Sequence, residues 1–165
     1  MRKFFLAQIL VLAAGVAFAW YTVSNDFWRF YDIEGTVFRV KDCAFPNPVT
    51  TPCFWGAVGF VVALGWAVII YRKPAIQKKQ QKFLMWFLVA GTIFGWSNFS
   101  LVLYKFLNNH GQPTIGCSGQ LTTNPFTTPC FIGSVLFAIA LLAAIVTRFV
   151  TKKNSFAGGA CRRIK

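Results

Sequence analysis

The chain has 165 residues, of which 56% are hydrophobic and only 13% are charged, and its formal net charge at pH 7 is +13. So apolar a composition excludes an ordinary soluble domain of this length. The basic excess does not indicate a nucleic-acid-binding protein either, because the basic residues flank apolar segments and form no recognisable nucleic-acid-binding module. We expect anionic lipid headgroups to be the partner of these charges.

Four apolar segments without a charged side chain dominate the sequence. Each has the length that a helix rising ~1.5 Å per residue needs to cross ~30 Å of hydrocarbon. Because a helix satisfies its own backbone hydrogen bonds, such segments should be helical in lipid. We therefore predict an all-α fold, a four-transmembrane-helix bundle with spans at residues 4–22, 53–71, 83–104 and 130–147.

The first span also resembles a cleavable signal peptide, because Arg2 and Lys3 precede an apolar core that ends in Ala17-Phe18-Ala19. An internal repeat favours a retained span. The sequence LAAGVAFAW at 12–20 aligns without gaps on LVAGTIFGW at 88–96, and the two share Leu, Ala, Gly, Phe and Trp. Since the second segment lies deep in the chain and cannot be a signal sequence, we expect the first to stay in the membrane as well.

The second and fourth spans begin with the same motif. The sequence NPVTTPCFWG at 47–56 recurs as NPFTTPCFIG at 124–133. Asn-Pro predicts a turn, threonine is a good N-cap, and proline is favoured at the first position of a helix. We call this the helix-start motif, and its predicted structural residues are Asn47, Pro48, Thr51, Pro52 and Gly56, with Asn124, Pro125, Thr128, Pro129 and Gly133 in the second copy.

Both spans of the first half thus recur in the same order in the second half. We predict two parallel helix-loop-helix repeats related by a pseudo-two-fold axis along the membrane normal. The first repeat covers 1–76 with an outer loop at 23–52, the second covers 77–150 with an outer loop at 105–129, and a basic tail follows at 151–165. Small residues in the first and third spans should let helices approach closely, although such residues are common in membrane helices generally; they are Gly15, Ala19, Gly91 and Gly95.

The positive charges predict the orientation. The N-terminus, the connection between the repeats and the tail contain most of the lysines and arginines and no acid, whereas all four acids lie in the first long loop. By the positive-inside rule, both chain termini face the cytoplasm and both long loops face away from it. The membrane is then a bacterial inner membrane or a membrane of the eukaryotic secretory pathway.

Each predicted outer loop and the helix that follows it contain two cysteines, Cys43 and Cys53 in the first copy and Cys117 and Cys130 in the second. Four cysteines can pair in three ways. Pairing within each copy respects the repeat and closes short loops, and each bridge would contribute ~2–3 kcal/mol on the chain-entropy model. Because disulfides persist outside the cytoplasm, we predict two structural disulfides, one in each copy.

A redox role for the same four cysteines is the alternative, because a thiol at a helix N-terminus can be activated. In helix count, orientation and cysteine pairs, the chain resembles the bacterial disulfide-bond formation protein B and, more loosely, vitamin K epoxide reductases. The resemblance implies a quinone-coupled membrane thiol-disulfide oxidoreductase with Cys43, Cys53, Cys117 and Cys130 as catalytic residues. The Cys-x-x-Cys pair of those families is absent here, and two such similar halves do not suit a relay, so we favour the structural role.

Other chemistry finds little support in the sequence. His110 is the only histidine, which excludes a histidine-rich metal site. No acid lies within a predicted span, so the usual carboxylate of a proton or ion pump is missing. Small-molecule or lipid transport stays open through Ser97, Asn98 and Ser100, and Cys161 in the tail is either a reduced thiol or a palmitoylation site.

The aromatic run FWRFY at 27–31 suits either a docking surface or a cap over the bundle. From these features we predict a non-catalytic structural or accessory subunit of a membrane assembly, without a metal or a cofactor. Its partner would be another membrane protein or a second copy of the chain.

Overall fold

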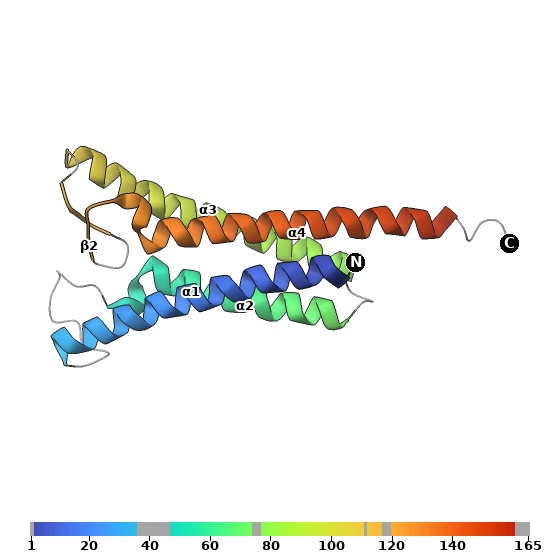
Figure 1. The fold of residues 1–165 in the computed structure, drawn as a ribbon, viewed down its shortest axis with the longest axis horizontal. Coiled ribbons are helices and arrows are strands. Elements are labelled where there is room, and N and C mark those ends of the chain that lie inside the picture. The colour runs from blue at the N-terminus through green and yellow to red at the C-terminus, as the bar shows by residue number, and fades with distance from the viewer. Residues whose placement is uncertain (1, 36–46, 74–76, 111, 117–119, 161–165) are drawn as a thin grey trace.

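The computed structural model describes residues 2–35, 47–73, 77–110, 112–116 and 120–160. Four long helices make up most of this structure: α1 (Arg2–Glu34), α2 (Pro52–Arg72), α3 (Gln77–Asn108) and α4 (Pro129–Ala160). They run side by side along one long axis (Figure 1). The fold is therefore all-helical apart from one small sheet, as the sequence predicts.

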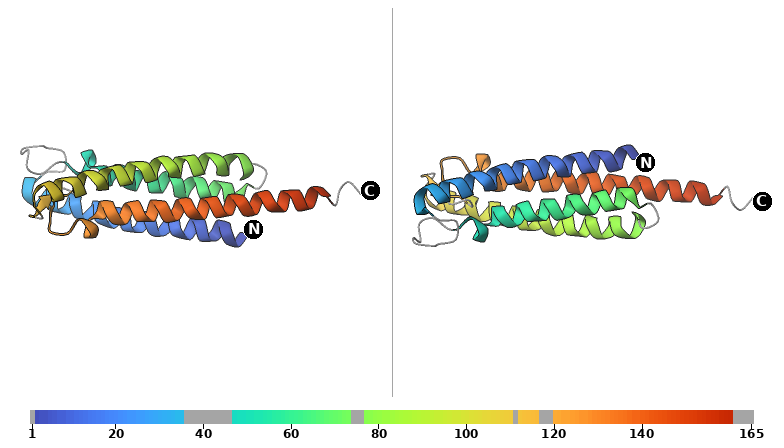
Figure 2. Two further views of the ribbon diagram at one scale, coloured as in Figure 1. Left: turned by 90° about the horizontal axis from the view of Figure 1, so that it is seen from above. Right: turned by 90° about the horizontal axis from the view of Figure 1, so that it is seen from below.

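The remaining elements gather at one end of the bundle, which we call the loop end (Figure 1). The 3-10 helices η1 (Pro48–Thr50) and η3 (Pro125–Thr127) precede α2 and α4. Between α3 and η3, β1 (Thr114–Ile115) and β2 (Leu121–Thr122) form a two-stranded antiparallel sheet. The start of α1, the end of α2 and the start of α3 lie at the opposite end, which we call the terminal end (Figure 2).

All four helices are long and apolar enough to cross a membrane. The segments that meet this criterion are Arg2–Glu34, Pro52–Arg72, Lys79–Asn108 and Pro129–Val150, and each contains one of the predicted spans. The fold is thus compatible with a polytopic membrane protein.

The first predicted outer loop is helical over its first part, because α1 continues through Glu34 instead of ending at residue 22. The buried residues Val23, Asp26 and Phe30 recur every three or four positions and place one face of this extension against the protein. Gly35 then ends the helix with a φ of +68°, and its N–H donates to the Tyr31 carbonyl oxygen at 2.8 Å. The sequence predicts a loop for this stretch because it contains charged residues, which are rare within a membrane span.

The aromatic run at 27–31 therefore lies on a helix, and its side chains divide between two faces. The Phe27 ring makes an edge contact with Phe54 of α2 at a centroid distance of 6.2 Å, and Phe30 is buried. Trp28 and Tyr31 are exposed. The run thus covers part of the loop end and also presents aromatic surface outward.

The centre of the core is a pair of stacked phenylalanines. Phe60 of α2 and Phe137 of α4 lie with ring centroids 3.9 Å apart and an interplanar angle of 24°. These two residues occupy aligned positions in the two halves of the sequence. The surrounding core is made of buried aliphatic residues from all four helices, including Leu12, Ala63, Ile70, Leu84, Leu88 and Ala140.

Glycines on α1 and α3 make room for this stack. A Cβ atom on Gly15 would lie 2.5 Å from the Phe60 ring, and one on Gly91 would lie 2.7 Å from the Phe137 ring. Gly95 packs against Ser134 of α4, whose Cα would be 3.3 Å from an added Cβ. Ala19 packs against the edge of the core. The small residues singled out in the sequence thus lie at contacts between the two helices of one half or at the core.

A buried amide pair joins the helices near the terminal end. Gln81 Nε2 of α3 donates to Gln8 Oε1 of α1 at 2.9 Å and to the Ala144 carbonyl oxygen of α4 at 3.3 Å. Both glutamine side chains are almost completely buried. Gln8 Nε2 and Gln81 Oε1 have no hydrogen-bond partner among the described residues. No motif or repeat in the sequence indicates either glutamine.

The glycine contacts give a first prediction. Gly91→Ala should lower the free energy of unfolding by ~1–3 kcal/mol, because the new methyl group would collide with the Phe137 ring. Gly133→Ala is the matched control, since a Cβ there meets nothing within 4 Å. Thermal unfolding of both variants in the same detergent measures the difference. Equal melting temperatures for the two would contradict the tight contact.

The amide pair gives a second prediction. Gln8→Leu and Gln81→Leu should each destabilise the protein by ~1–3 kcal/mol, because each leaves one buried polar group without its partner. The double variant should lose clearly less free energy of unfolding than the two single variants lose together, since it removes both polar groups at once. A double-mutant cycle of unfolding free energies measures this coupling, and strictly additive effects would show that the two amides act independently.

Candidate functional site

The helix-start motif builds the same local structure in both copies. Thr51 is the N-cap of α2, and its Oγ1 accepts the Phe54 N–H at 3.4 Å. The Thr128 hydroxyl accepts the Phe131 N–H at the same distance at the start of α4. The residues before them are ordered in the same way, because the Asn47 and Asn124 side chains accept from the N–H two positions on.

The proline and glycine positions of the motif complete this arrangement. Pro48 and Pro125 open the 3-10 helices and are buried, and their carbonyl oxygens accept the hydroxyls of the capping threonines. Pro52 and Pro129 are the first residues of α2 and α4. A Cβ atom added to Gly56 or to Gly133 would have no other atom within 4 Å of it, so close packing does not require glycine at these positions.

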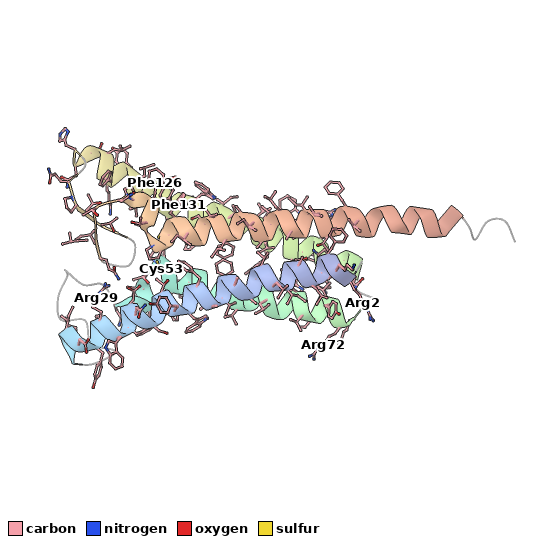
Figure 3. All side chains as sticks on the ribbon, in the orientation of Figure 1. Arg2, Arg29, Cys53, Arg72, Phe126 and Phe131 are labelled. Atoms are coloured by element: carbon pink, nitrogen blue, oxygen red, sulfur yellow. The ribbon has the colours of Figure 1, made fainter. Side chains whose placement is uncertain are left out.

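This arrangement brings the two motif cysteines together. Cys53 and Cys130 lie in the first turns of α2 and α4, and their sulfur atoms are 3.9 Å apart. That distance is a van der Waals contact, well beyond the ~2.05 Å of a disulfide bond. Cys53 lies near the loop end, far from Arg2 and Arg72 at the terminal end (Figure 3).

The other predicted cysteines, Cys43 and Cys117, lie outside the described residues, as does Cys161 in the tail. The within-copy disulfides therefore stay predictions. The sequence repeat indicated that Cys53 and Cys130 are equivalent, but it gave no sign that they touch.

A small cavity of about 50 Å³ adjoins the two cysteines, and we call it the outer pocket. Its walls come from all four helices and are mostly apolar. The lining residues occupy aligned positions in the two halves, and they include Cys53 and Cys130, Gly56 and Gly133, Phe60 and Phe137, Phe18 and Phe94, and Thr22 and Asn98. The pocket is thus built alike by both halves of the chain, directly beside the central phenylalanine stack.

One buried acid breaks this equivalence. Asp26 of α1 is only 4% exposed, and its Oδ1 accepts hydrogen bonds from Arg29 Nη2 and Gln120 Nε2, each at 3.3 Å. Its Oδ2 has no partner in the part of the chain that the structure describes. The aligned residue in the second half is Val102, which is also buried. The second half thus has a valine where the first half has a buried carboxyl group.

The second half has a larger aromatic cluster at the loop end than the first, in which Phe54 contacts only Phe27 and Trp55 among the described aromatic residues. Phe131 of α4 lies 5.4 Å from Phe126 of η3 and 5.0 Å from Phe99 of α3, measured between ring centroids (Figure 3). Trp96 completes the cluster through Phe99 and Phe131. The cluster fixes η3 against α3 and α4, so it positions the helix start that carries Cys130.

The polar residues considered for transport do not form a polar cavity. Asn98 lines the outer pocket, but its Nδ2 donates to the Phe94 carbonyl oxygen of its own helix at 2.7 Å. Ser97 and Ser100 are exposed on α3. His110 is exposed at the end of α3 with a φ of +52°, and the described residues contain no group of three or more side chains that could hold a metal ion.

Comparisons of the chain with protein-family models, with curated proteins and with solved structures find no match. The resemblance to disulfide-bond formation protein B therefore has no support beyond the residues that suggested it. The features of the loop end that bear on function are the two touching cysteines and the small apolar pocket.

Proposed function

We propose that the chain is a polytopic membrane protein that serves as a non-catalytic structural or accessory subunit of a membrane assembly. In this proposal the loop end faces away from the cytoplasm and is held together by the disulfides Cys43–Cys53 and Cys117–Cys130. Its partner is another membrane protein or a second copy of the chain, and anionic lipid headgroups contact its basic end.

The size of the outer pocket is the main observation behind this role. Pockets that bind small molecules usually have volumes of ~300–1,000 Å³, whereas the outer pocket has about 50 Å³. The cysteines beside it are held by capped helix starts and by buried prolines. The arrangement therefore suits bracing of the loop end better than binding of a substrate.

The distribution of charge supports the orientation. Arg2 and Arg72 lie together at the terminal end, and the acids Asp26, Asp32 and Glu34 lie on the opposite end of α1 (Figure 3). Arg29 and Lys105 also lie toward the loop end, but the acids of the described residues all lie there too. Basic residues without acids, as at the terminal end, are what the positive-inside rule associates with the cytoplasmic side.

The disulfides and the orientation can be tested together. Peptide mapping of protein purified under native, non-reducing conditions should find Cys43 linked to Cys53 and Cys117 linked to Cys130. In sealed cells, an impermeant maleimide should label these four cysteines only after reduction and should label Cys161 only after permeabilisation. Four free thiols, or a Cys53–Cys130 bond, would overturn the pairing, and labelling of Cys161 from outside would overturn the orientation.

A quinone-coupled thiol-disulfide oxidoreductase is the second candidate, and the sulfur contact of 3.9 Å favours it. Exchange of electrons between two cysteine pairs requires one sulfur of each pair to reach the other, and Cys53 and Cys130 meet that condition. The buried acid Asp26, which is replaced by Val102 in the second half, would also allow the two pairs to differ. The outer pocket, however, is too small for a quinone ring, so the residues beside the sulfurs do not fit this cofactor as they stand.

Single cysteine variants separate the two candidates. Cys43→Ser and Cys117→Ser should each lower the free energy of unfolding by ~2–3 kcal/mol through loss of one bridge, without trapping another protein. A redox enzyme would instead form a stable mixed disulfide between the remaining Cys53 or Cys130 and a soluble thioredoxin-like partner. Non-reducing electrophoresis with mass spectrometry distinguishes these outcomes, and Cys161→Ser serves as the control variant.

A further inference from the structure

An apolar groove of about 260 Å³ runs between α2 and α3. Trp55, Gly56 and Gly59 of α2 line one side, Phe87 and Phe94 of α3 belong to the other, and Phe137 of α4 also lines it. No charged side chain lines it. Gly56, Phe94 and Phe137 also line the outer pocket, so the groove adjoins the pocket on its α2–α3 side.

The groove has a cause in the sequence. Gly59 of α2 aligns with Leu136 of α4, so α2 has no side chain at the position where α4 has a leucine. A Cβ on Gly59 would lie 3.5 Å from the Phe137 ring, which is an ordinary contact. A side chain could therefore start at position 59 without a clash at its Cβ and extend into the groove.

The dimensions of the groove indicate what fills it. On α3 its lining residues run from Phe87 to Phe94, which is ~10 Å of helix. A volume of about 260 Å³ over that length is several times smaller than that of a helix ~10–12 Å across. The groove thus suits a thin apolar chain lying along it better than a helix seated within it.

The direction of the groove agrees with this. Trp55 lies in the first turn of α2 at the loop end, and Phe87 lies farther toward the terminal end on α3. A lipid chain in the leaflet at the loop end runs the same way, from the membrane surface toward the middle of the bilayer. Trp55 is 58% exposed, and an aromatic side chain of this kind is favoured at the headgroup level.

We propose that the groove between α2 and α3 binds one acyl chain of a phospholipid from the leaflet at the loop end. The bound chain covers the exposed faces of Trp55 and Phe94 and closes the side of the bundle next to the outer pocket. This site rests on the membrane placement proposed above, but it does not depend on the disulfides or on the accessory role.

Photo-crosslinking tests the site directly. The purified protein is reconstituted into phosphatidylcholine vesicles that contain a phosphatidylcholine with a diazirine in the middle of one acyl chain. After irradiation, peptide mapping should find the labelled sites concentrated at residues 55–59 and 87–94. Uniform labelling along the exposed faces of all four helices would overturn the proposal, and an absence of any labelling would instead show that the chain does not enter the membrane.

Two glycine variants that copy the second half of the chain provide the decisive comparison. Gly59→Leu introduces the residue of position 136 and fills the groove, so labelling at residues 55–59 and 87–94 should fall at least fivefold. Gly65→Leu introduces the residue of the aligned position 142 on an exposed face where an added Cβ meets nothing within 4 Å, and labelling should not change. Equal labelling in the two variants would overturn the assignment.

A second variant guards against misfolding of the first. Ala90→Leu fills the same groove from α3 and should also reduce labelling, and a melting temperature close to that of the unsubstituted protein shows that each variant is folded. If instead the unsubstituted protein forms protein–protein crosslinks through residues 55–59 and excludes the lipid label there, a second copy occupies the groove and the proposal is wrong.

Discussion

The contact on which the structure depends is the stack of Phe60 on Phe137. Each ring belongs to the second helix of one half, and each occupies space that a glycine of the first helix leaves open, Gly15 in one case and Gly91 in the other. The same two rings therefore hold the helices of each half together and join the two halves. Because apolar burial supplies little attraction between helices inside lipid, such close packing has to supply much of it.

The stack also explains why the loop end has its geometry. Cys53 precedes Phe60 by two turns of α2, and Cys130 precedes Phe137 by two turns of α4, so rings in contact bring the sulfurs into contact. The capping threonines fix where each helix begins, so that both cysteines lie in the first helical turn. The outer pocket is the space that remains between these two levels, which is why it is small.

Much of this could be predicted from the sequence, and the rest follows from contacts that a sequence does not display. Four uncharged apolar segments were enough to predict the helices, and the repeated Asn-Pro and Thr-Pro steps predicted where α2 and α4 begin. The predicted end of α1 at residue 22 was wrong, because the charged residues from Asp26 onward are typical of a loop. The three- and four-residue spacing of Val23, Asp26 and Phe30 is the signal that would have indicated a continuing helix. The pairing of Gln8 with Gln81 joins residues that do not align in the repeat, so the repeat gave no indication of it.

The departures from symmetry have a common pattern. The middle of the core is the same in the two halves, as the stacked Phe60 and Phe137 show. Other positions differ, with Asp26 against Val102 at the loop end and Gly59 against Leu136 beside the groove. A buried acid in an apolar bundle is costly unless it is hydrogen bonded, and Gln120 and Arg29 supply those bonds from the second loop and from α1 itself. The residues shared by the two halves therefore fix how the helices pack, while the residues that differ give each side of the bundle a different surface. Chemistry or binding that distinguishes the two halves is expected to arise from the positions that differ, because the stacked phenylalanines and the touching cysteines are the same in both halves.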